Sequence, residues 1–366
     1  MSRLEDFEYL EMAFGLAEKA VGRASPNPYV GAVLVRKGAV VGAGWHEGPG
    51  KPHAEIIALK QAGTLARGAC LYVTLEPCVH WGRTPPCLGP VLEAGLERVV
   101  ISSFDPNPLV NRRGAAALRR AGLDVSVGLH EEKNRKLNEA YFKFIRRREP
   151  FVTLKAASTL DGRMATRSLK SRWISSPAAR EYAHLLRAEH DAILVGIGTV
   201  LKDDPLLTVR HPLWPDKRPL RVVLDSHLRF PLNARLLATL DSGPLLIFTG
   251  PNISPAKARR LEKRGAEIVP LTGGKRGLPL GRVLRELGRR QVAGLLVEGG
   301  SAVCSSFLEH RLADKLFLIL SPKLFGGLRA PSFYEGRGAD LVRDALRLDP
   351  LRLFDLNGEI FLEGYL

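Results

Sequence analysis

The sequence predicts a two-domain α/β protein, and three observations carry that prediction. The chain has 366 residues, about twice the usual length of a single domain. Short β-branched runs alternate with stretches in which apolar residues recur every three or four positions. A charged helical run over 131–148 ends before Pro150, and an apolar strand begins at once. We therefore expect one domain over 1–148 and a second over 149–366.

The first domain begins with a predicted helix, because apolar residues from Leu4 to Ala17 recur at spacings of three and four. Two short β-branched runs follow, and the Arg-Lys-Gly sequence at 36–38 between them is typical of a hairpin turn. Beyond this hairpin, helices alternate with strands, as in α/β layering. We expect strands over 29–35, 39–43, 70–75, 99–102 and 125–127, and helices over 53–62, 88–94, 115–121 and 131–148.

The second domain begins with a predicted strand over 151–156, directly after the proline that stops the preceding helix. The alternation of strands and helices then continues, which again indicates α/β layering. We expect further strands over 192–195, 220–224, 245–249, 293–297 and 315–320, and helices over 177–188, 255–264, 280–290 and 302–309.

Composition excludes several classes of protein. The formal net charge is +16, but it is spread as +5 over residues 1–150 and +11 over 151–366, so no basic tail indicates nucleic-acid binding. No apolar run approaches the roughly 18–20 residues of a membrane span, and the acidic N-terminus is unlike a signal peptide. Four cysteines are too few for a disulfide scaffold in a chain of this length, so we expect a reducing, cytoplasmic setting.

The strongest chemical signal is a His-x-Glu motif at His53 and Glu55, followed by Cys78 and Cys87. Zinc prefers thiolate and imidazole ligands, and a catalytic site keeps three protein ligands and one open position for water. Bound zinc lowers the pKa of that water, and a neighbouring carboxylate can carry its proton to a departing amine. The sequence therefore predicts His53, Cys78 and Cys87 as zinc ligands and Glu55 as the catalytic proton shuttle, the pattern of zinc deaminases.

Two features leave alternatives open at this zinc site. Eight residues separate Cys78 from Cys87, where the general zinc-deaminase pattern has two. A purely structural site with four protein ligands is also compatible with the sequence, with His80 as the fourth ligand. Cys70 and Cys304 stand apart from the motif, and we interpret both as small buried apolar side chains.

Two glycine motifs in the second half follow predicted strands. The sequence LLVEGGS at 295–301 indicates a buried strand that runs into a glycine turn and then a helix, whose N-terminus can bind a phosphate of a dinucleotide. Taken alone, such a glycine pair more often marks an ordinary turn. The second motif, Gly-Ile-Gly-Thr at 196–199, does not complete the Rossmann fingerprint, because Leu201 stands where the third glycine belongs. We therefore do not predict a Rossmann domain.

The segments around the zinc motif resemble one half of a known two-domain family. SPNPYVGAVLV at 25–35, HAE at 53–55 and VTLEPCVHWGRTPPC at 73–87 are similar to the deaminase half of the bifunctional riboflavin-biosynthesis deaminase/reductase family. The resemblance implies a cytidine-deaminase-like αβα domain with the zinc ligands and proton shuttle named above. It also implies that Asn27 lies near the substrate, whereas Pro-Asn-Pro by itself indicates only a turn.

The second half resembles the reductase half of the same family, which is similar to dihydrofolate reductase in fold and uses NADPH. The segments that carry this resemblance are LKAASTLDGR at 154–163, SRWIS at 171–175, LLRAEHDAILVGIGTVLKDDPLLTVR at 185–210, VVLDS at 222–226 and VEGGS at 297–301. The NADPH contacts that it implies are Ala157, Trp173, Thr199, Asp203, Ser226, Gly300, Ser301, Ala302, Val303, Cys304, Ser305 and Ser306. The substrate contacts that it implies are Ser171, Arg187, Leu207, Arg210 and Glu298.

Residue chemistry is compatible with a substrate site in this half. Arg187 and Arg210 suit a ribose phosphate, because a guanidinium binds phosphate through two parallel hydrogen bonds. Lys155 alternates with apolar neighbours on a predicted strand, which is unusual for lysine and favours a side chain that faces a substrate site. Lys155, Asp203 and Glu298 are the candidates for polar assistance to the reduction.

The resemblance implies a bifunctional enzyme of riboflavin biosynthesis, both a hydrolase and an oxidoreductase. Zinc hydroxide deaminates a diamino-ribosylamino-pyrimidinone 5′-phosphate, and NADPH then reduces its ribosyl group to ribityl. We expect a homo-oligomer without a nucleic-acid or membrane partner. One alternative is a zinc nucleic-acid (tRNA) deaminase with a basic accessory module, which the aromatic content of 7% disfavours. Another is a structural zinc protein whose second half binds a dinucleotide without turnover.

Overall fold

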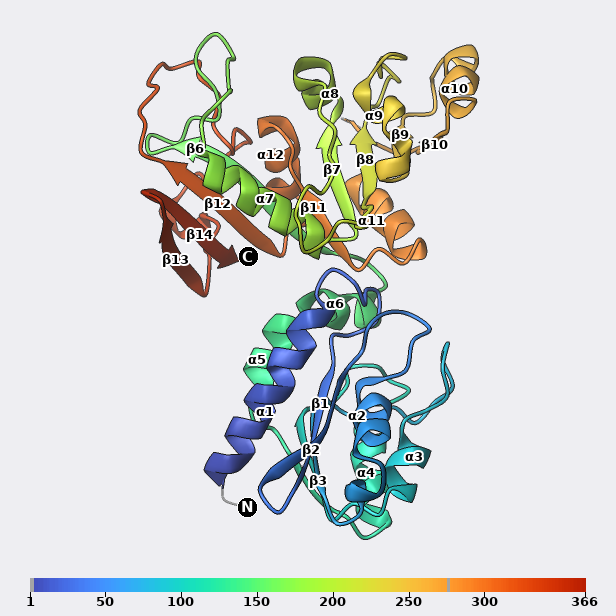
Figure 1. The fold of residues 1–366 in the computed structure, drawn as a ribbon. Coiled ribbons are helices and arrows are strands. Elements are labelled where there is room, and N and C mark those ends of the chain that lie inside the picture. Colours follow the sequence, from blue (N-terminus) through green and yellow to red (C-terminus); the bar gives the residue numbers. More distant parts are fainter. Residues whose placement is uncertain (1–2, 275–276) are drawn as a thin grey trace. The chain divides into compact units, whose positions relative to one another are not determined.

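The computed structural model describes residues 3–274 and 277–366. Contacts within the chain divide it into two units, Met1–Arg148 and Glu149–Leu366. Each unit is built on one sheet, of five strands in the first and nine in the second (Figure 1). Within the described residues, no helix combines the length and apolar character needed to cross a membrane.

The five-stranded sheet of the first unit has the order β2-β1-β3-β4-β5. The β1–β2 hairpin and the β1–β3 pair are antiparallel, whereas β3, β4 and β5 run parallel. The strands are β1 Gly31–Arg36, β2 Ala39–Trp45, β3 Cys70–Leu75, β4 Arg98–Ser103 and β5 Asp124–Val127. The helices are α1 Arg3–Ala17, α2 Ala54–Ala62, α3 Leu88–Glu93, α4 Arg113–Arg120, α5 Glu131–Leu137 and α6 Glu139–Arg147.

Helices cover both faces of this sheet, with α1 and α5 on one face and α2, α3 and α4 on the other (Figure 1). Leu10 and Ala13 of α1 are buried in a cluster with Val33 and Tyr72. The alanines of α2, including Ala58, pack in a separate cluster with strand residues of the opposite face. Each strand therefore buries alternate side chains against different helices, as the period of two requires.

Helix α2 lies unusually close to β2, because two glycines leave room for it. A Cβ atom at Gly42 would lie 2.3 Å from the carbonyl oxygen of Ala58, and one at Gly44 would lie 2.5 Å from that of Ala54. Such distances are too short for any side chain, so only glycine permits this approach. The glycines thereby fix the position of the first turn of α2, where His53 and Glu55 stand.

The nine-stranded sheet of the second unit has the order β10-β9-β8-β7-β11-β6-β12-β14-β13. The first seven strands in this order are parallel, and β14 and β13 close the edge as antiparallel strands. The strands are β6 Phe151–Thr159, β7 Ala192–Gly196, β8 Leu220–Leu224, β9 Leu245–Thr249, β10 Ala266–Pro270, β11 Gly294–Val297, β12 Lys315–Ser321, β13 Leu351–Leu356 and β14 Glu359–Tyr365. The helices are α7 Pro177–Glu189, α8 Ile197–Asp203, α9 Arg235–Ala238, α10 Pro255–Glu262, α11 Leu280–Arg289 and α12 Ser301–Glu309.

Helices also cover both faces of the second sheet. Helices α11 and α12 pack on one face, where Val283 and Phe307 join a cluster with Leu194. Helices α8, α9 and α10 pack on the other face, where Val200 joins a cluster with Val195. Neighbouring residues of one strand thus enter the cores on opposite faces of the sheet. Because both faces are covered, every residue of a strand such as β7, AILVG, is buried and apolar.

The predicted elements are present, with two kinds of departure. The expected single helix over 131–148 is two helices that meet at Asn138, whose backbone departs from helical geometry with a φ of −107° and whose buried side chain bonds both the N–H and the C=O of Tyr29. Helices α8 and α9 and strands β10, β13 and β14 were not predicted. Strand β13 is largely exposed and its sequence lacks clean alternation, so a periodicity of two gave no signal there.

Replacing Gly44 by alanine is expected to destabilise the first unit, because the new methyl group must push α2 away from β2. Overpacking of this kind typically costs ~1–3 kcal/mol of unfolding free energy, which denaturant unfolding measures. Gly15→Ala is the matched control, since nothing lies within 4 Å of its Cβ position on α1. We expect the control to be neutral or slightly stabilising. Equal stability of the two variants would contradict the account.

Candidate active sites

The first site lies where β3 ends and α2 begins. Cys78 follows β3 through Glu76-Pro77, His53 is the N-cap residue of α2, and Cys87 directly precedes α3. Nδ1 of His53 lies 2.8 Å from Sγ of Cys87 and 3.5 Å from Sγ of Cys78. The two sulfur atoms are 3.4 Å apart. The structure therefore brings together the three side chains that the sequence predicts as zinc ligands.

This arrangement fits a zinc ion. Zinc bonds to sulfur and nitrogen are about 2.3 and 2.0 Å long, so two ligand atoms of one ion lie within the sum of their bond lengths, a limit of about 4.3 Å for sulfur and nitrogen and about 4.6 Å for two sulfurs. All three distances are shorter than these limits. Among the described residues, only His53, Cys78 and Cys87 form a group of this kind, and His80 is not part of it. The open fourth position favours a catalytic site over the four-ligand structural alternative.

The position of Cys78 depends on Glu76, a buried carboxylate that sequence reasoning missed. Its oxygens accept backbone N–H groups from Asp105 at 3.3 Å and from Arg112 and Ala115 at 2.9 Å each. These donors include the first turn of α4, where a negative charge is favourable. The carboxylate thereby ties the turn that carries Cys78 to the start of another helix.

Electrostatics at this site favour metal binding and proton transfer. Hydrogen bonds from Cys87 and His53 hold the pKa of Cys78 well below its usual range, although burial opposes them. Cys78 is thus disposed to be the thiolate that zinc requires. Glu55 stands in the first turn of α2 with 3% of its surface exposed. Burial raises the pKa of Glu55, so its carboxyl is disposed to hold a proton.

Asn27, the predicted substrate contact, lies beside this site. Its Nδ2 is 2.9 Å from Nε2 of His46, whose ring meets the ring of His53 edge-on with centroids 5.2 Å apart. His46 was not predicted, because a lone histidine after a strand carries no sequence signal. Its Nδ1 is 3.1 Å from the carbonyl oxygen of Pro52, so the ring is held from both sides.

Two further polar residues near the site were also missed. Thr84 belongs to the loop between the cysteines, and its hydroxyl oxygen lies 2.8 Å from Nε2 of His53. Asp105 follows β4, is almost fully buried and accepts hydrogen bonds from the hydroxyl of Tyr141 and the N–H of Asn107. Burial raises the pKa of Asp105 to about 6. The pairing of β3 with β4 brings Asp105 to the site, whereas Thr84 reaches it through the fold of the loop between the two cysteines.

The remaining cysteines behave as interpreted from the sequence. Cys70 and Cys304 are 2% and 1% exposed, and both are free thiols. Burial raises the pKa of each to about 11, so they stay neutral. They contribute to packing and take no part in the zinc group.

In the second unit, Lys155, Arg187 and Glu298 form a charged cluster. The guanidinium of Arg187 donates from Nε and Nη2 to the two carboxylate oxygens of Glu298, at 2.8 and 2.7 Å. A third bond runs from Nη1 to the carbonyl oxygen of Thr208. Burial alone would raise the pKa of Glu298, but the charges of Arg187 and Lys155 hold it at about 2. Arg187 is therefore engaged by a carboxylate rather than free for a phosphate.

Arg210, by contrast, is exposed and has no carboxylate partner among the described contacts. Its backbone N–H donates to Nδ1 of His184 at 3.3 Å, and its Nη2 lies 3.0 Å from Nε2 of the same ring. Burial, together with the charges of Arg187 and Arg210, lowers the pKa of His184 to about 4, so the ring is neutral. Leu207, three residues earlier, is buried with a positive φ of 51°. The loop that carries Leu207 and Arg210 is thus held by the burial of Leu207 and by the contacts of Arg210 with His184.

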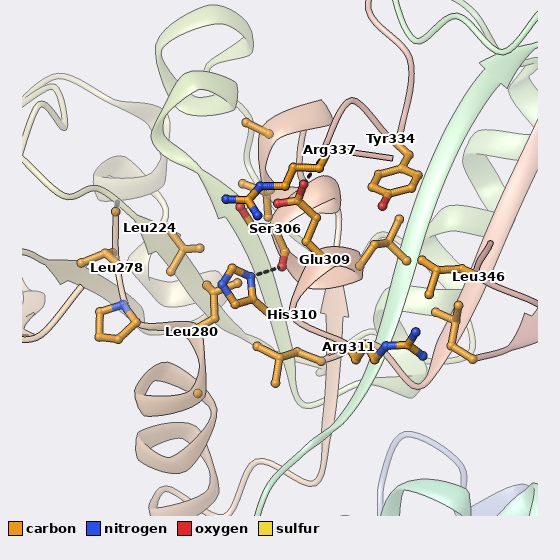
Figure 2. A pocket seen from close by; sticks show the side chains of 18 of the residues that line it. Leu224, Leu278, Leu280, Ser306, Glu309, His310, Arg311, Tyr334, Arg337 and Leu346 are labelled. Atoms are coloured by element: carbon orange, nitrogen blue, oxygen red, sulfur yellow. Dashed lines mark hydrogen bonds between the residues drawn. The ribbon is translucent and has the colours of Figure 1, made fainter. Parts of the chain in front are cut away.

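A cavity of about 1500 Å³ lies beside α12. Figure 2 shows Leu224, Leu278 and Leu280 on one side of it and Tyr334 and Leu346 on the other, with Ser306 and His310 between them. Four predicted NADPH contacts line this cavity, namely Ser226, Ala302, Val303 and Ser306. Cys304 is buried and Ser305 accepts the N–H of Glu335, so neither side chain lines it.

Gly300 is the N-cap of α12 and has no side-chain cap, which suits the binding of a phosphate at this helix end. Ser301 beside it donates its hydroxyl to Glu335. The remaining predicted residues of this half stand outside the cavity. Trp173 is 64% exposed, with the guanidinium of Arg180 over its ring at 4.4 Å. The other predicted NADPH and substrate residues here are half-buried. Ala157 lies on β6, Ser171 lies two residues before Trp173, and Thr199 and Asp203 lie on α8.

Two family models match this chain. Residues 4–103 match the cytidine and deoxycytidylate deaminase zinc-binding region. Residues 150–359 match the RibD C-terminal domain. The second match covers more than half of the chain and decides against an RNA-binding accessory module in this part.

Curated relatives match over nearly the full length. The riboflavin biosynthesis protein RibD of Aquifex aeolicus is 45% identical over 326 residues, which cover 89% of each chain. The RibD protein of Bacillus amyloliquefaciens is 41% identical over 97% of this chain and 94% of its own. The chain belongs to the RibD family. It is a bifunctional deaminase and reductase of riboflavin biosynthesis, with a zinc-binding deaminase domain and a reductase domain that uses a nicotinamide cofactor.

Solved RibD structures have the same architecture. Acinetobacter baumannii RibD superimposes with a TM-score of 0.87 and 34% identity, covering 100% of this chain and 99% of its own. The Thermotoga maritima protein, a diaminohydroxyphosphoribosylaminopyrimidine deaminase/5-amino-6-(5-phosphoribosylamino)uracil reductase, gives 0.85 and 35% identity over 98% of both chains. The predicted fold class is confirmed, with a cytidine-deaminase-like domain followed by a dihydrofolate-reductase-like RibD domain. The nucleic-acid deaminase and the non-catalytic zinc protein are thereby set aside.

Removing the charge of Glu298 is expected to destabilise the RibD reductase domain strongly at neutral pH. Glu298→Gln leaves Arg187 buried without a carboxylate, which costs about 3–5 kcal/mol of unfolding free energy. The pKa of about 2 lies below the ordinary value, so this stabilisation is present above about pH 4.5 and is lost as the pH falls toward 2. The difference between parent and variant should therefore shrink between pH 5 and pH 3 in denaturant unfolding.

The matched control for this prediction is Glu267→Gln, which removes an exposed partner of Arg290. A surface ion pair contributes less than about 1 kcal/mol, so this variant should stay near the parent at every pH. A pH-independent loss in Glu298→Gln, or an equal loss in the control, would contradict the proposed charge cluster.

Proposed function

We propose that this chain catalyses two successive steps on one phosphorylated substrate. The first removes the exocyclic amine of a diamino-ribosylamino-pyrimidinone 5′-phosphate. The second reduces the ribosyl group of the product to ribityl. The observation that carries the proposal is the His53–Cys78–Cys87 group with the buried carboxylate of Glu55 beside it, on the same chain as a RibD reductase domain.

In the deaminase site, His53, Cys78 and Cys87 hold the zinc ion and leave one position for water. Bound zinc lowers the pKa of its water toward neutrality and thereby supplies the nucleophile. The carboxylate of Glu55 would carry both protons of that water in turn, one to the ring nitrogen, where it stays, and the other to the departing amine, which leaves as ammonia. Asn27, held by His46, orients the substrate.

In the reductase site, residues at the start of α12 would hold the cofactor. Bound NADPH supplies a hydride to the sugar carbon that carries the amine. Gly300 and the first turn of α12 bind its phosphates, and Ser226, Ala302, Val303 and Ser306 face it across the cavity. The residues proposed to complete the cofactor site are Ala157, Trp173, Thr199, Asp203, Ser301, Cys304 and Ser305, the buried Cys304 through its backbone.

On the substrate side, we assign the ribose phosphate to Arg210, whose guanidinium is exposed. Arg187 holds the carboxylate of Glu298, and Lys155 beside it lowers the cost of burying that charge. Burial lowers the pKa of Lys155, so it can give up a proton more readily than an exposed lysine. Lys155 is therefore positioned to supply a proton near the reacting sugar, with the ionised carboxylate of Glu298 as its charge partner. Ser171 and Leu207 complete the substrate site.

We also propose a homo-oligomer that works in the cytoplasm. Strand β13 forms the edge of its sheet and exposes Leu351, Leu353 and Phe354 to 46%, 62% and 38%. An exposed apolar edge strand of this kind favours pairing with another chain. The two thiolate ligands need a reducing compartment, and all four cysteines are free. The substrates are small phosphorylated pyrimidines, and no nucleic-acid partner is proposed.

Replacing Glu55 tests the deaminase assignment. Glu55→Ala should keep bound zinc, because the three ligands are intact, yet lose about 10²–10⁴-fold in the rate of ammonia release, since the proton shuttle is gone. Metal analysis and an ammonia assay measure the two effects. NADPH oxidation with the deaminated intermediate is the internal control and should be unchanged. A variant that deaminates normally would refute the proton-shuttle role.

Replacing Arg210 tests the phosphate assignment. Arg210→Ala should raise the KM for the phosphorylated intermediate about 10–100-fold, since a charge-assisted hydrogen bond contributes about 1.5–3 kcal/mol. The Kd for NADPH, measured by fluorescence, should change little. The control is Arg259→Ala on α10, which removes an equal charge from an exposed surface. An equal loss of affinity for substrate and NADPH would count against a phosphate contact.

A further inference from the structure

The loop between the two zinc-binding cysteines supplies more than a connection. Its eight residues, 79–86, replace the two residues of the general zinc-deaminase spacing. The loop returns to the site so that Thr84 Oγ1 lies 2.8 Å from Nε2 of His53. On the other side of the same ring, Nδ1 faces the sulfur atoms of Cys87 and Cys78. The imidazole is therefore held between a hydroxyl and the metal position.

We propose that Thr84 is a positioning residue for the metal ligand His53. A metal bound through Nδ1 needs the lone pair there, so the ring must carry its proton on Nε2. The hydroxyl oxygen of Thr84 accepts a hydrogen bond from that Nε2–H group, which fixes both the tautomer and the orientation of the ring. Partners of this kind typically change metal affinity 10–100-fold when they are removed. The inference rests on the zinc site of the proposed function.

The loop is built to hold Thr84 in place. The N–H of Gly82 donates to the carbonyl oxygen of Thr84 at 3.2 Å, which closes a tight turn around it. Pro85 and Pro86 follow directly, and a proline restricts both its own φ and the conformation of the residue before it. At the far end, the N–H of Cys87 donates to Sγ of Cys78. The threonine hydroxyl is thus presented by a stiffened segment.

The neighbouring histidine does not compete for this role. His46 has its Nδ1 on the carbonyl oxygen of Pro52 and its Nε2 on the side chain of Asn27. It touches His53 only through the edge-on ring contact, which bonds neither ring nitrogen. Among the described contacts, Thr84 is the partner of Nε2. Removing its hydroxyl therefore leaves the ring free to adopt the other tautomer.

The test uses the full chain and compares Thr84→Val with Thr84→Ser. Valine keeps the shape but loses the hydroxyl, whereas serine keeps the acceptor. Competition with a chromophoric chelator measures zinc affinity, which should fall 10–100-fold in Thr84→Val and stay within a few-fold of the parent in Thr84→Ser. In the zinc-loaded protein, NMR should show that the Nε2 proton of His53 exchanges faster in the valine variant. Thr64→Val, at an exposed threonine outside the site, is the control and should match the parent.

Two results would overturn the proposal. Zinc affinity in Thr84→Val equal to the parent, or an equal loss in Thr84→Ser, would show that the hydroxyl does not position His53. A thermal unfolding transition like that of the parent in both variants verifies that the unit carrying Thr84 is folded. An error in the zinc site itself would give a different result. The parent and His53→Ala would then bind the same amount of zinc.

Discussion

Parallel pairing of strands is the constraint on which both active sites depend. In the first unit, Leu75 of β3 pairs with Ser103 of β4, so the segments that follow the two strands emerge at one edge of the sheet. Glu76 and Asp105 meet there, and the turn that carries Cys78 is fixed. In the second unit, Val297 of β11 pairs with Leu154 on one side and Leu194 on the other. The same geometry therefore places the residues that follow β11 between the second half of β6 and the end of β7, in agreement with ligand binding at the carboxyl ends of parallel strands.

Each of these edges buries charge, and each charge has a partner. A carboxylate removed from water costs several kcal/mol unless hydrogen bonds or an opposite charge replace its hydration. Glu76 is compensated by three backbone N–H groups, and Glu298 by the guanidinium of Arg187. A fold that served packing alone would gain from apolar side chains at these positions. One of these charges holds the turn that carries the metal ligand Cys78, and the other holds Arg187 in the reductase domain.

The sequence predicted the parts of each site that are local or that have distinctive chemistry. Spacing and residue type identified His53, Cys78 and Cys87, because few combinations other than zinc binding explain a His-x-Glu motif with two nearby cysteines. The partners that hold the site in place are far away in the sequence. The N–H donors to Glu76 lie 29–39 positions from it, and Thr84 lies 31 positions from His53, so no periodicity connects them. The Arg187–Glu298 pair spans 111 positions, so Arg187 looked like a free phosphate ligand. The family resemblance supplied the reductase residues. Which of them line the cavity and which belong to the charged cluster could be seen only in the structure.

The central claim is that one chain deaminates a phosphorylated pyrimidine and then reduces it. The most direct measurement follows ammonia release and NADPH oxidation together in one sample of the zinc-loaded protein. With the diamino substrate, ammonia should appear before NADPH is consumed, and the two totals should be equal. Removing zinc with a chelator should stop both reactions with this substrate, yet leave NADPH oxidation with the deaminated intermediate intact. NADPH oxidation that continues with the diamino substrate after zinc removal, or that is absent with the intermediate, would contradict the account.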